Sequence, residues 1–175
     1  MLGLRASGRL LVLDAATGAS RRTIAPQGTA LQESGKWSLS PDRKTLAFVG
    51  SQNRSQDITV TLFAAKTGAQ LRRMPVDTRF SPLGICWSPD SRRISLVSEH
   101  YMRDAVFNNR LAGEVTIWDV DTGRLLVTLN REGLATGHNR AIRFSPDNLR
   151  LLHIATDNRT ERGGGRLYLH PIHIW

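Results

Sequence analysis

The sequence predicts an all-β protein made of repeated strand–turn–strand units, because two short motifs alternate along its 175 residues. The first motif is two apolar residues separated by one position and followed by Ser-Pro-Asp, and its copies end at Asp42, Asp90 and Asp147. The second is an alternating apolar stretch closed by Thr-Gly, and its copies end at Gly18, Gly68 and Gly123. Successive copies lie 48 to 57 residues apart, which is typical of a repeat architecture.

Both motifs have the chemistry of tight turns between antiparallel strands. The proline of Ser-Pro-Asp presets φ at the second turn position, and the Ser and Asp side chains can bond the backbone of the turn. Proline also ends the preceding strand, because it has no N–H for the ladder. In the Thr-Gly motif, glycine supplies the positive φ that a short hairpin needs, so we expect a positive φ at Gly123.

The strands between the turns show the alternation of half-buried β-structure. Val115 and Ile117 are predicted to lie on one side of their strand, with Thr116 and Trp118 on the other. Cys86 follows an apolar residue in such a strand and is predicted to be a small buried side chain.

These residues resemble the WD-repeat family of β-propellers. The third unit matches best, with Trp118-Asp119 before its Thr-Gly and Gly137-His138 before the next Ser-Pro-Asp. The resemblance implies an all-β fold of four-stranded antiparallel blades, of which about three are present as a partial propeller. Phe63-Ala64 and Leu13-Asp14 replace Trp-Asp in other units, so the family's buried Asp-His-Ser-Trp network is not expected to form intact. These departures also leave a likeness to the TolB-like and prolyl-oligopeptidase propellers.

The predicted organisation is a single partial propeller domain over residues 1–175. Its blades are expected at 9–25 (two strands), 36–75 and 83–130 (complete) and 140–170 (three strands), about thirteen strands in all. Propellers close with typically four to eight blades. We therefore expect the sequence to be part of a larger propeller, or to complete its ring with another chain and to self-associate through open blade edges.

The composition limits the environment and the partners. The formal net charge is +9, but the 24 basic residues are scattered along the chain with no run longer than two. No apolar stretch is long enough for a membrane span or a secretory signal, and one cysteine fits a reducing compartment, so a cytoplasmic protein without membrane contact is expected. A protein partner, which the charge would allow to be acidic, is favoured over nucleic acid.

The predicted binding surface lies on the long loops between the second and third strands of each blade, residues 50–57, 99–113 and 157–165. The candidate partner-binding face consists of Arg54, Tyr101, Arg103, Phe107, Arg110, Arg159 and Arg162. Two interpretations stay open: an arginine-lined face for an acidic group, or an ordinary solvated face of an arginine-rich protein.

No catalytic constellation is present in the sequence. It contains no Gly-x-Ser-x-Gly elbow, P-loop or His-Glu-x-x-His motif, and no catalytic, cofactor-binding or metal-binding residue is predicted. The expected function is therefore a non-catalytic scaffold of WD-repeat type that mediates protein–protein interaction. The alternatives are a propeller segment of a prolyl-oligopeptidase or TolB-like protein and a basic nucleic-acid-associated propeller module.

Overall fold

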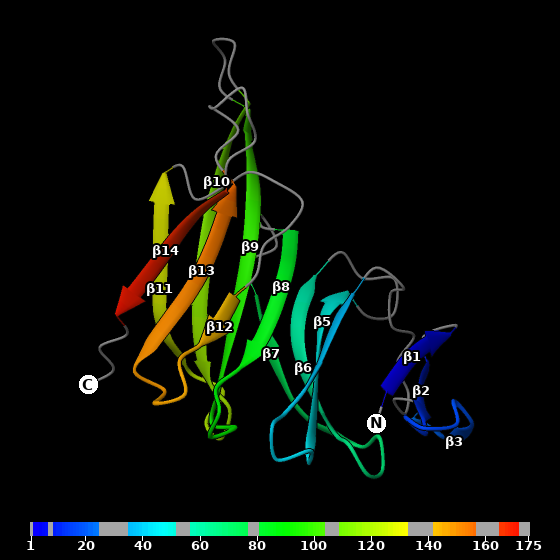
Figure 1. Ribbon diagram of the computed structural model, residues 1–175. Helices are drawn as coiled ribbons and strands as arrows, with labels where there is room; N and C mark the ends of the chain where they lie inside the picture. Colours follow the sequence, from blue (N-terminus) through cyan, green and yellow to red (C-terminus); the bar gives the residue numbers. More distant parts are fainter. Residues whose placement is uncertain are drawn as a thin grey trace. The chain divides into compact units, whose positions relative to one another are not determined.

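The computed structural model describes residues 2–6, 9–24, 35–51, 57–76, 81–103, 109–132, 142–156 and 165–171 (Figure 1). This part of the chain contains strands and turns and no helix. The strands are β1 (Leu2–Ala6), β2 (Arg9–Leu13), β3 (Ser20–Ile24), β4 (Lys36–Leu39), β5 (Thr45–Ser51), β6 (Ile58–Ala64), β7 (Gln70–Pro75), β8 (Ser81–Trp87), β9 (Arg93–Arg103), β10 (Asn109–Asp119), β11 (Leu125–Glu132), β12 (Ile142–Phe144), β13 (Arg150–Thr156) and β14 (Gly165–Pro171).

The strands form four antiparallel sheets in chain order. Two sheets have four strands, β4-β5-β6-β7 and β8-β9-β10-β11, and two have three, β1-β2-β3 and β12-β13-β14. The chain divides into two compact units, residues 1–76 and 77–175, and each unit holds one sheet of each size. The predicted all-β architecture of four-stranded antiparallel blades in a partial propeller is confirmed. The assignment of all 175 residues to one domain stays a prediction.

One strand was absent from the sequence prediction. The first blade was expected to begin at residue 9, but β1 pairs with β2 from Leu2 opposite Leu13 to Ala6 opposite Arg9. A five-residue stretch with glycine at its second position carries too little alternation to be recognised as a strand. Pairing satisfies the backbone groups of β1 that face β2, and the described strands number fourteen instead of about thirteen.

The core of the first unit lies between its two sheets. Val12 and Ile24 of the β1–β3 sheet are buried with Leu46, Phe48, Phe63 and Ala65 of the second sheet, and Trp37 and Leu39 pack against them. The Trp37 ring centroid lies 4.9 Å from that of Phe48 and 6.1 Å from that of Phe63. A Cβ atom added at Gly35 would overlap the Phe48 ring, so this glycine makes room for the aromatic core.

The second unit repeats this arrangement between β8–β11 and β12–β14. Its core contains Cys86, Val97, Val115 and Ile117 from the first of these sheets and Ile142, Phe144 and Leu151 from the second. The predicted alternation in β10 is confirmed, because Val115 and Ile117 enter this core while the indole Nε1 of Trp118 donates to Thr116 Oγ1 at 3.1 Å. Each unit is thus a pair of sheets packed face to face, as adjacent blades are in a propeller.

The three Ser-Pro-Asp turns share one geometry. At Ser40, Ser88 and Ser145 the carbonyl accepts a hydrogen bond from the N–H three residues later, at 2.9–3.0 Å. The serine Oγ donates to the Asp carboxylate and accepts from the N–H five residues later, at 2.8–2.9 Å. The residue after each Asp has a φ of 62–63°, and these residues are Arg43, Ser91 and Asn148. The sequence indicates the turn but gives no sign of this left-handed position, because none of its occupants is glycine.

The three Thr-Gly hairpins also match one another. Gly18, Gly68 and Gly123 have φ values of 69°, 76° and 73°, which confirms the expectation for Gly123. In the third hairpin Asp119 Oδ1 accepts from both the backbone N–H and the hydroxyl of Thr122, each at 2.7 Å. In the first, Asp14 accepts from two turn N–H groups. Ala64 occupies this position in the second hairpin and offers no carboxylate.

Candidate partner-binding surface

The side chains of the predicted partner-binding face lie outside the described part of the structure. Arg54, Phe107, Arg159 and Arg162 fall wholly outside the described residues. Tyr101 and Arg103 lie in β9 and Arg110 lies in β10, where the backbone alone is described. The choice between a contact face and an ordinary solvated face therefore stays open for these seven residues.

The backbone corrects the predicted loop at 99–113. β9 runs to Arg103 and β10 begins at Asn109, so most of this segment is a β-hairpin. Within it, Tyr101 lies opposite Leu111, and Arg110 lies opposite Met102. The sequence did not indicate this extension, because cross-strand backbone bonds hold a two-stranded ribbon without any alternating apolar pattern.

This hairpin extends past its neighbouring strands. The pairing of β8 with β9 ends at Glu99, and the pairing of β10 with β11 ends at Ala112. Residues 100–103 and 109–111 therefore form a two-stranded extension beyond the four-stranded sheet, which we call the β9–β10 ribbon (Figure 1). None of these seven residues is acidic, and they include Tyr101, Arg103 and Arg110. The ribbon is thus a protrusion from the β8–β11 sheet whose sequence contains aromatic and cationic residues.

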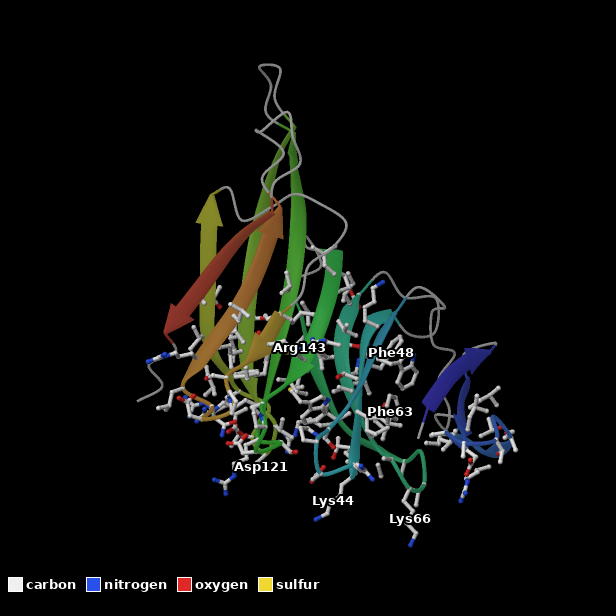
Figure 2. All side chains as sticks on the ribbon, viewed as in Figure 1. Lys44, Phe48, Phe63, Lys66, Asp121 and Arg143 are labelled. Carbon is white, nitrogen blue, oxygen red and sulfur yellow. The ribbon has the colours of Figure 1, made fainter. Side chains whose placement is uncertain are left out.

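The turn ends of the blades carry many of the described charges. Exposed cations follow the turns of both units: Lys44, Lys66, Arg92, Arg124 and Arg150. Figure 2 shows Lys44 and Lys66 pointing away from the β4–β7 sheet and Asp121 at a turn of the second unit. Acidic residues of the same turns lie among these cations, so the described charge is mixed and does not by itself select a binding face.

The turn carboxylates are held by hydrogen bonds. The Ser40 hydroxyl and then the Lys44 N–H lower the pKa of Asp42 below its ordinary value. The hydroxyl and the N–H of Thr122 lower the pKa of Asp119. At Asp90 burial acts to raise the pKa, but hydrogen bonds from Ser88 and Arg92 outweigh it and the net direction is down. These carboxylates stay ionised at neutral pH and serve the turns that they cap.

A polar contact joins successive turns within the second unit. The N–H of Asp90 donates to Asn148 Oδ1 at 3.3 Å, and Arg93 Nη1 donates to the Asn148 carbonyl oxygen at 3.3 Å. Asn148 holds the left-handed position of its own turn, where asparagine is tolerated better than most residues. The sequence gives no signal for this contact, because its partners lie 55 and 58 residues apart.

The one cysteine of the chain lies in the core of the second unit. The Cys86 side chain is buried, as predicted, and this burial raises its pKa to about 12, so the thiol is protonated and unreactive at neutral pH. Within the described ranges, no group of three or more His, Cys, Asp or Glu side chains could hold a metal ion. The same ranges contain no helix of the length and apolarity needed to cross a membrane.

Comparison with known proteins identifies the fold. No family model and no curated protein matches the sequence. Among solved structures, hydrazine synthase of Kuenenia stuttgartiensis is similar with a TM-score of 0.61 and 16% identity, over 85% of this chain and 46% of that one. The complex of KlAtg21 with the coiled coil of AgAtg16 gives 0.58 and 19%, over 95% of this chain and 48% of that one. The β-propeller domain of the trilobed protease from Pyrococcus furiosus gives 0.51 and 12%, over 94% and 49%.

These likenesses define the class of protein as a partial β-propeller. The chain spans less than half the length of each of the three structures. The three structures are a synthase, a protein complex and the propeller domain of a protease, so the shared fold does not select an activity.

Proposed function

We propose that this chain is a non-catalytic propeller scaffold of the WD-repeat type that binds a protein partner through the β9–β10 ribbon. The observation that carries the proposal is the continuation of β9 and β10 beyond the last pairs of β8 and β11. An extension of this kind adds contact surface to a rigid sheet without any change in the core, and binding residues concentrate on such extensions.

The chemistry of the ribbon favours a protein partner. Tyrosine and arginine are enriched at the centres of protein interfaces, and the ribbon has one Tyr and two Arg among seven residues. The absence of acidic residues in these seven positions favours a partner with exposed carboxylates. A cytoplasmic location fits the unpaired, buried Cys86.

The test removes the ribbon and keeps the blade. Glu99 lies opposite Gly113, so residues 100–112 can be replaced by Asn-Gly as a two-residue hairpin turn. The immobilised 175-residue chain should capture a defined protein from nuclease-treated extract, and the shortened chain should lose it. Lys44→Ala with Lys66→Ala, both on the turn ends, is the matched control and should retain it. Equal capture without the ribbon contradicts the proposal, and capture that nuclease abolishes favours the nucleic-acid alternative.

A second candidate is a propeller segment of a peptidase. The likeness to the propeller of the trilobed protease, over 94% of this chain, supports it. In that case the gene should encode a Gly-x-Ser-x-Gly nucleophile elbow in the same reading frame, whereas further blades without such a motif would support the scaffold.

A further inference from the structure

The outermost strand of the second complete blade lacks a protection that the other outer strands have. Among the described strands, β3, β7 and β11 each come last in their sheet and pair with one neighbour only; β14 does so too, and β1, β4, β8 and β12 form the opposite edges. β3 contains Arg21-Arg22, and β7 contains Arg72-Arg73 and ends in Pro75. Charge and proline on an edge strand discourage pairing with other chains. Between Leu125 and Asn130, β11 contains neither a charged residue nor a proline.

The pairing of each outer strand with its neighbour allows β3, β7 and β11 to be compared position by position. All three outer strands bulge at one residue, and the bulges fall at Arg21, Leu71 and Leu126. The residue two positions later pairs with the neighbouring strand as Thr23 with Leu11 in β3, as Arg73 with Thr61 in β7 and as Thr128 with Thr116 in β11. Thr128 therefore occupies the position of Arg73 in β7 and of Thr23 in β3, and its side chain is exposed.

The β11 edge is also apolar and accessible. Leu125 is 46% exposed and Leu126 is 37% exposed. Val127 and Leu129 pack partly against the core of the second unit, which holds the strand in place. Every second residue of a paired strand directs its N–H and C=O away from its neighbour, so an eight-residue edge offers a row of backbone groups.

We propose that β11 is a docking edge for an extended peptide of a partner protein, with an apolar or neutral centre and acidic residues at its ends. The peptide would add a fifth strand to the β8–β11 sheet through backbone hydrogen bonds. Its chemistry follows from charge complementarity: Arg124 precedes the uncharged stretch Leu125–Asn130, Arg131 follows it, and the chain as a whole carries +9. Glu132, at the last position of β11, leaves residues 124–132 with one net positive charge. A second copy of this chain would bring the same positive charge and is disfavoured.

The test uses labelled synthetic peptides with the 175-residue chain. One peptide has a core of alternating Thr and Val flanked by Glu at both ends; the second has the same core flanked by Lys. The Glu-flanked peptide should bind about fivefold more tightly at low salt, because each exposed ion pair contributes up to about 1 kcal/mol, and the difference should shrink at high salt. Equal binding of the two peptides overturns the stated chemistry.

Variants of the chain locate the site. Thr128→Glu places a negative charge on the β11 edge and should weaken the Glu-flanked peptide at least tenfold, while Leu71→Glu on β7 should leave binding unchanged. Both substitutions are on exposed residues, and equal melting temperatures would show that both variants are folded. Binding that survives Thr128→Glu, or that is lost equally with Leu71→Glu, overturns the proposal. Concentration-dependent dimers that Thr128→Glu dissolves would assign the edge to a second copy instead.

The β11 edge would be a second contact site of the proposed scaffold, and its biological role rests on that proposed function. Peptide binding to the edge can be measured without the ribbon. The chain without the ribbon should bind the Glu-flanked peptide as the intact chain does, because β11 pairs with β10 as far as Ala112. Loss of partner capture with unchanged peptide binding would therefore confirm the ribbon and the edge as separate sites.

Discussion

At the scale of single residues, the two turn motifs are stabilised by side chains that complete the backbone hydrogen bonding. Each Ser-Pro-Asp serine both donates to the Asp carboxylate and accepts from the N–H that opens the next strand, as at Ser88 with Asp90 and Arg93. Asp119 caps its hairpin through Thr122 in the same way. These bonds explain why short polar residues recur at fixed places in a chain with little other repetition.

Replacement of Gly123 tests the left-handed turn position. Because φ is 73° at this residue, Gly123→Val should lower the free energy of unfolding by about 1–3 kcal/mol, since a β-branched side chain is strained there. Gly123→Asn should cost less, because asparagine tolerates this conformation. Urea unfolding of both variants measures the difference, and an equal loss would mean that the turn has another geometry.

Ala64 offers the opposite test, a gain of stability. It occupies the place of Asp14 and Asp119, and the N–H of Gly68 already bonds its carbonyl oxygen at 2.8 Å. Ala64→Asp should raise the free energy of unfolding by about 0.5–1 kcal/mol through new bonds to the turn N–H groups. Asp119→Ala is the reciprocal control and should lose a similar amount. A destabilised Ala64→Asp protein would show that the second hairpin has no room for the cap.

At the scale of elements, the turns couple the stability of the blades to pH. The carboxyl pKa values of Asp42, Asp90 and Asp119 are lower in the folded chain than the ordinary value of 3.8. The ionised caps therefore contribute stability that is fully present above about pH 4 and is lost as the pH falls through the lowered values.

The corresponding measurement is the urea midpoint as a function of pH. These three carboxylates should leave the urea midpoint unchanged between pH 7 and 5, and their protonation should lower it below about pH 4. Asp42→Asn combined with Asp119→Asn should make the acid limb shallower, because two of the titrating caps are removed. An acid limb that is unchanged in this variant would assign the acid sensitivity to other carboxylates.

Asn148 tests the contact between successive blades of the second unit. Asn148→Ala should destabilise by about 1–3 kcal/mol, since it introduces strain at a φ of 62° and removes the acceptor for the Asp90 N–H. Asn148→Gly keeps the conformation and removes the acceptor alone, so its loss should be smaller. Hydrogen exchange at the Asp90 amide should accelerate in both variants. Unchanged exchange would show that this bond does not hold in solution.

At the scale of the whole molecule, the two units repeat one plan: a pair of sheets with an apolar core between them. The core of the first unit is built around the aromatic residues Phe48 and Phe63, whereas the core of the second unit contains mainly aliphatic residues. The same plan with different packing is expected of repeats whose turns are alike and whose strand residues differ.

The net charge of +9 belongs to this scale as well, because the cations are spread over the chain. We expect the chain to elute from heparin and from a simple sulfonate resin at about the same salt concentration, as diffuse positive charge does. Markedly later elution from heparin, with steep salt dependence of binding to DNA or RNA, would favour the nucleic-acid alternative.

The sequence by itself determined the local chemistry of this protein: where the chain turns, which strands alternate and that they form antiparallel blades. Ser-Pro-Asp and Thr-Gly fix their turns through bonds within six residues, and such bonds can be read in order along the chain. The alternation of Val115 to Trp118 was predictable because a period-two apolar pattern is also read along neighbouring residues.

Only the tertiary structure decided the features that depend on pairing between distant or unpatterned segments. β1 and the β9–β10 ribbon are held by cross-strand backbone bonds, which any sequence can make and no side-chain pattern marks. The Asn148 contact joins residues more than fifty positions apart. The exposed, uncharged edge of β11 became visible only when the register aligned Thr128 with Arg73, because an edge is defined by which neighbour a strand lacks.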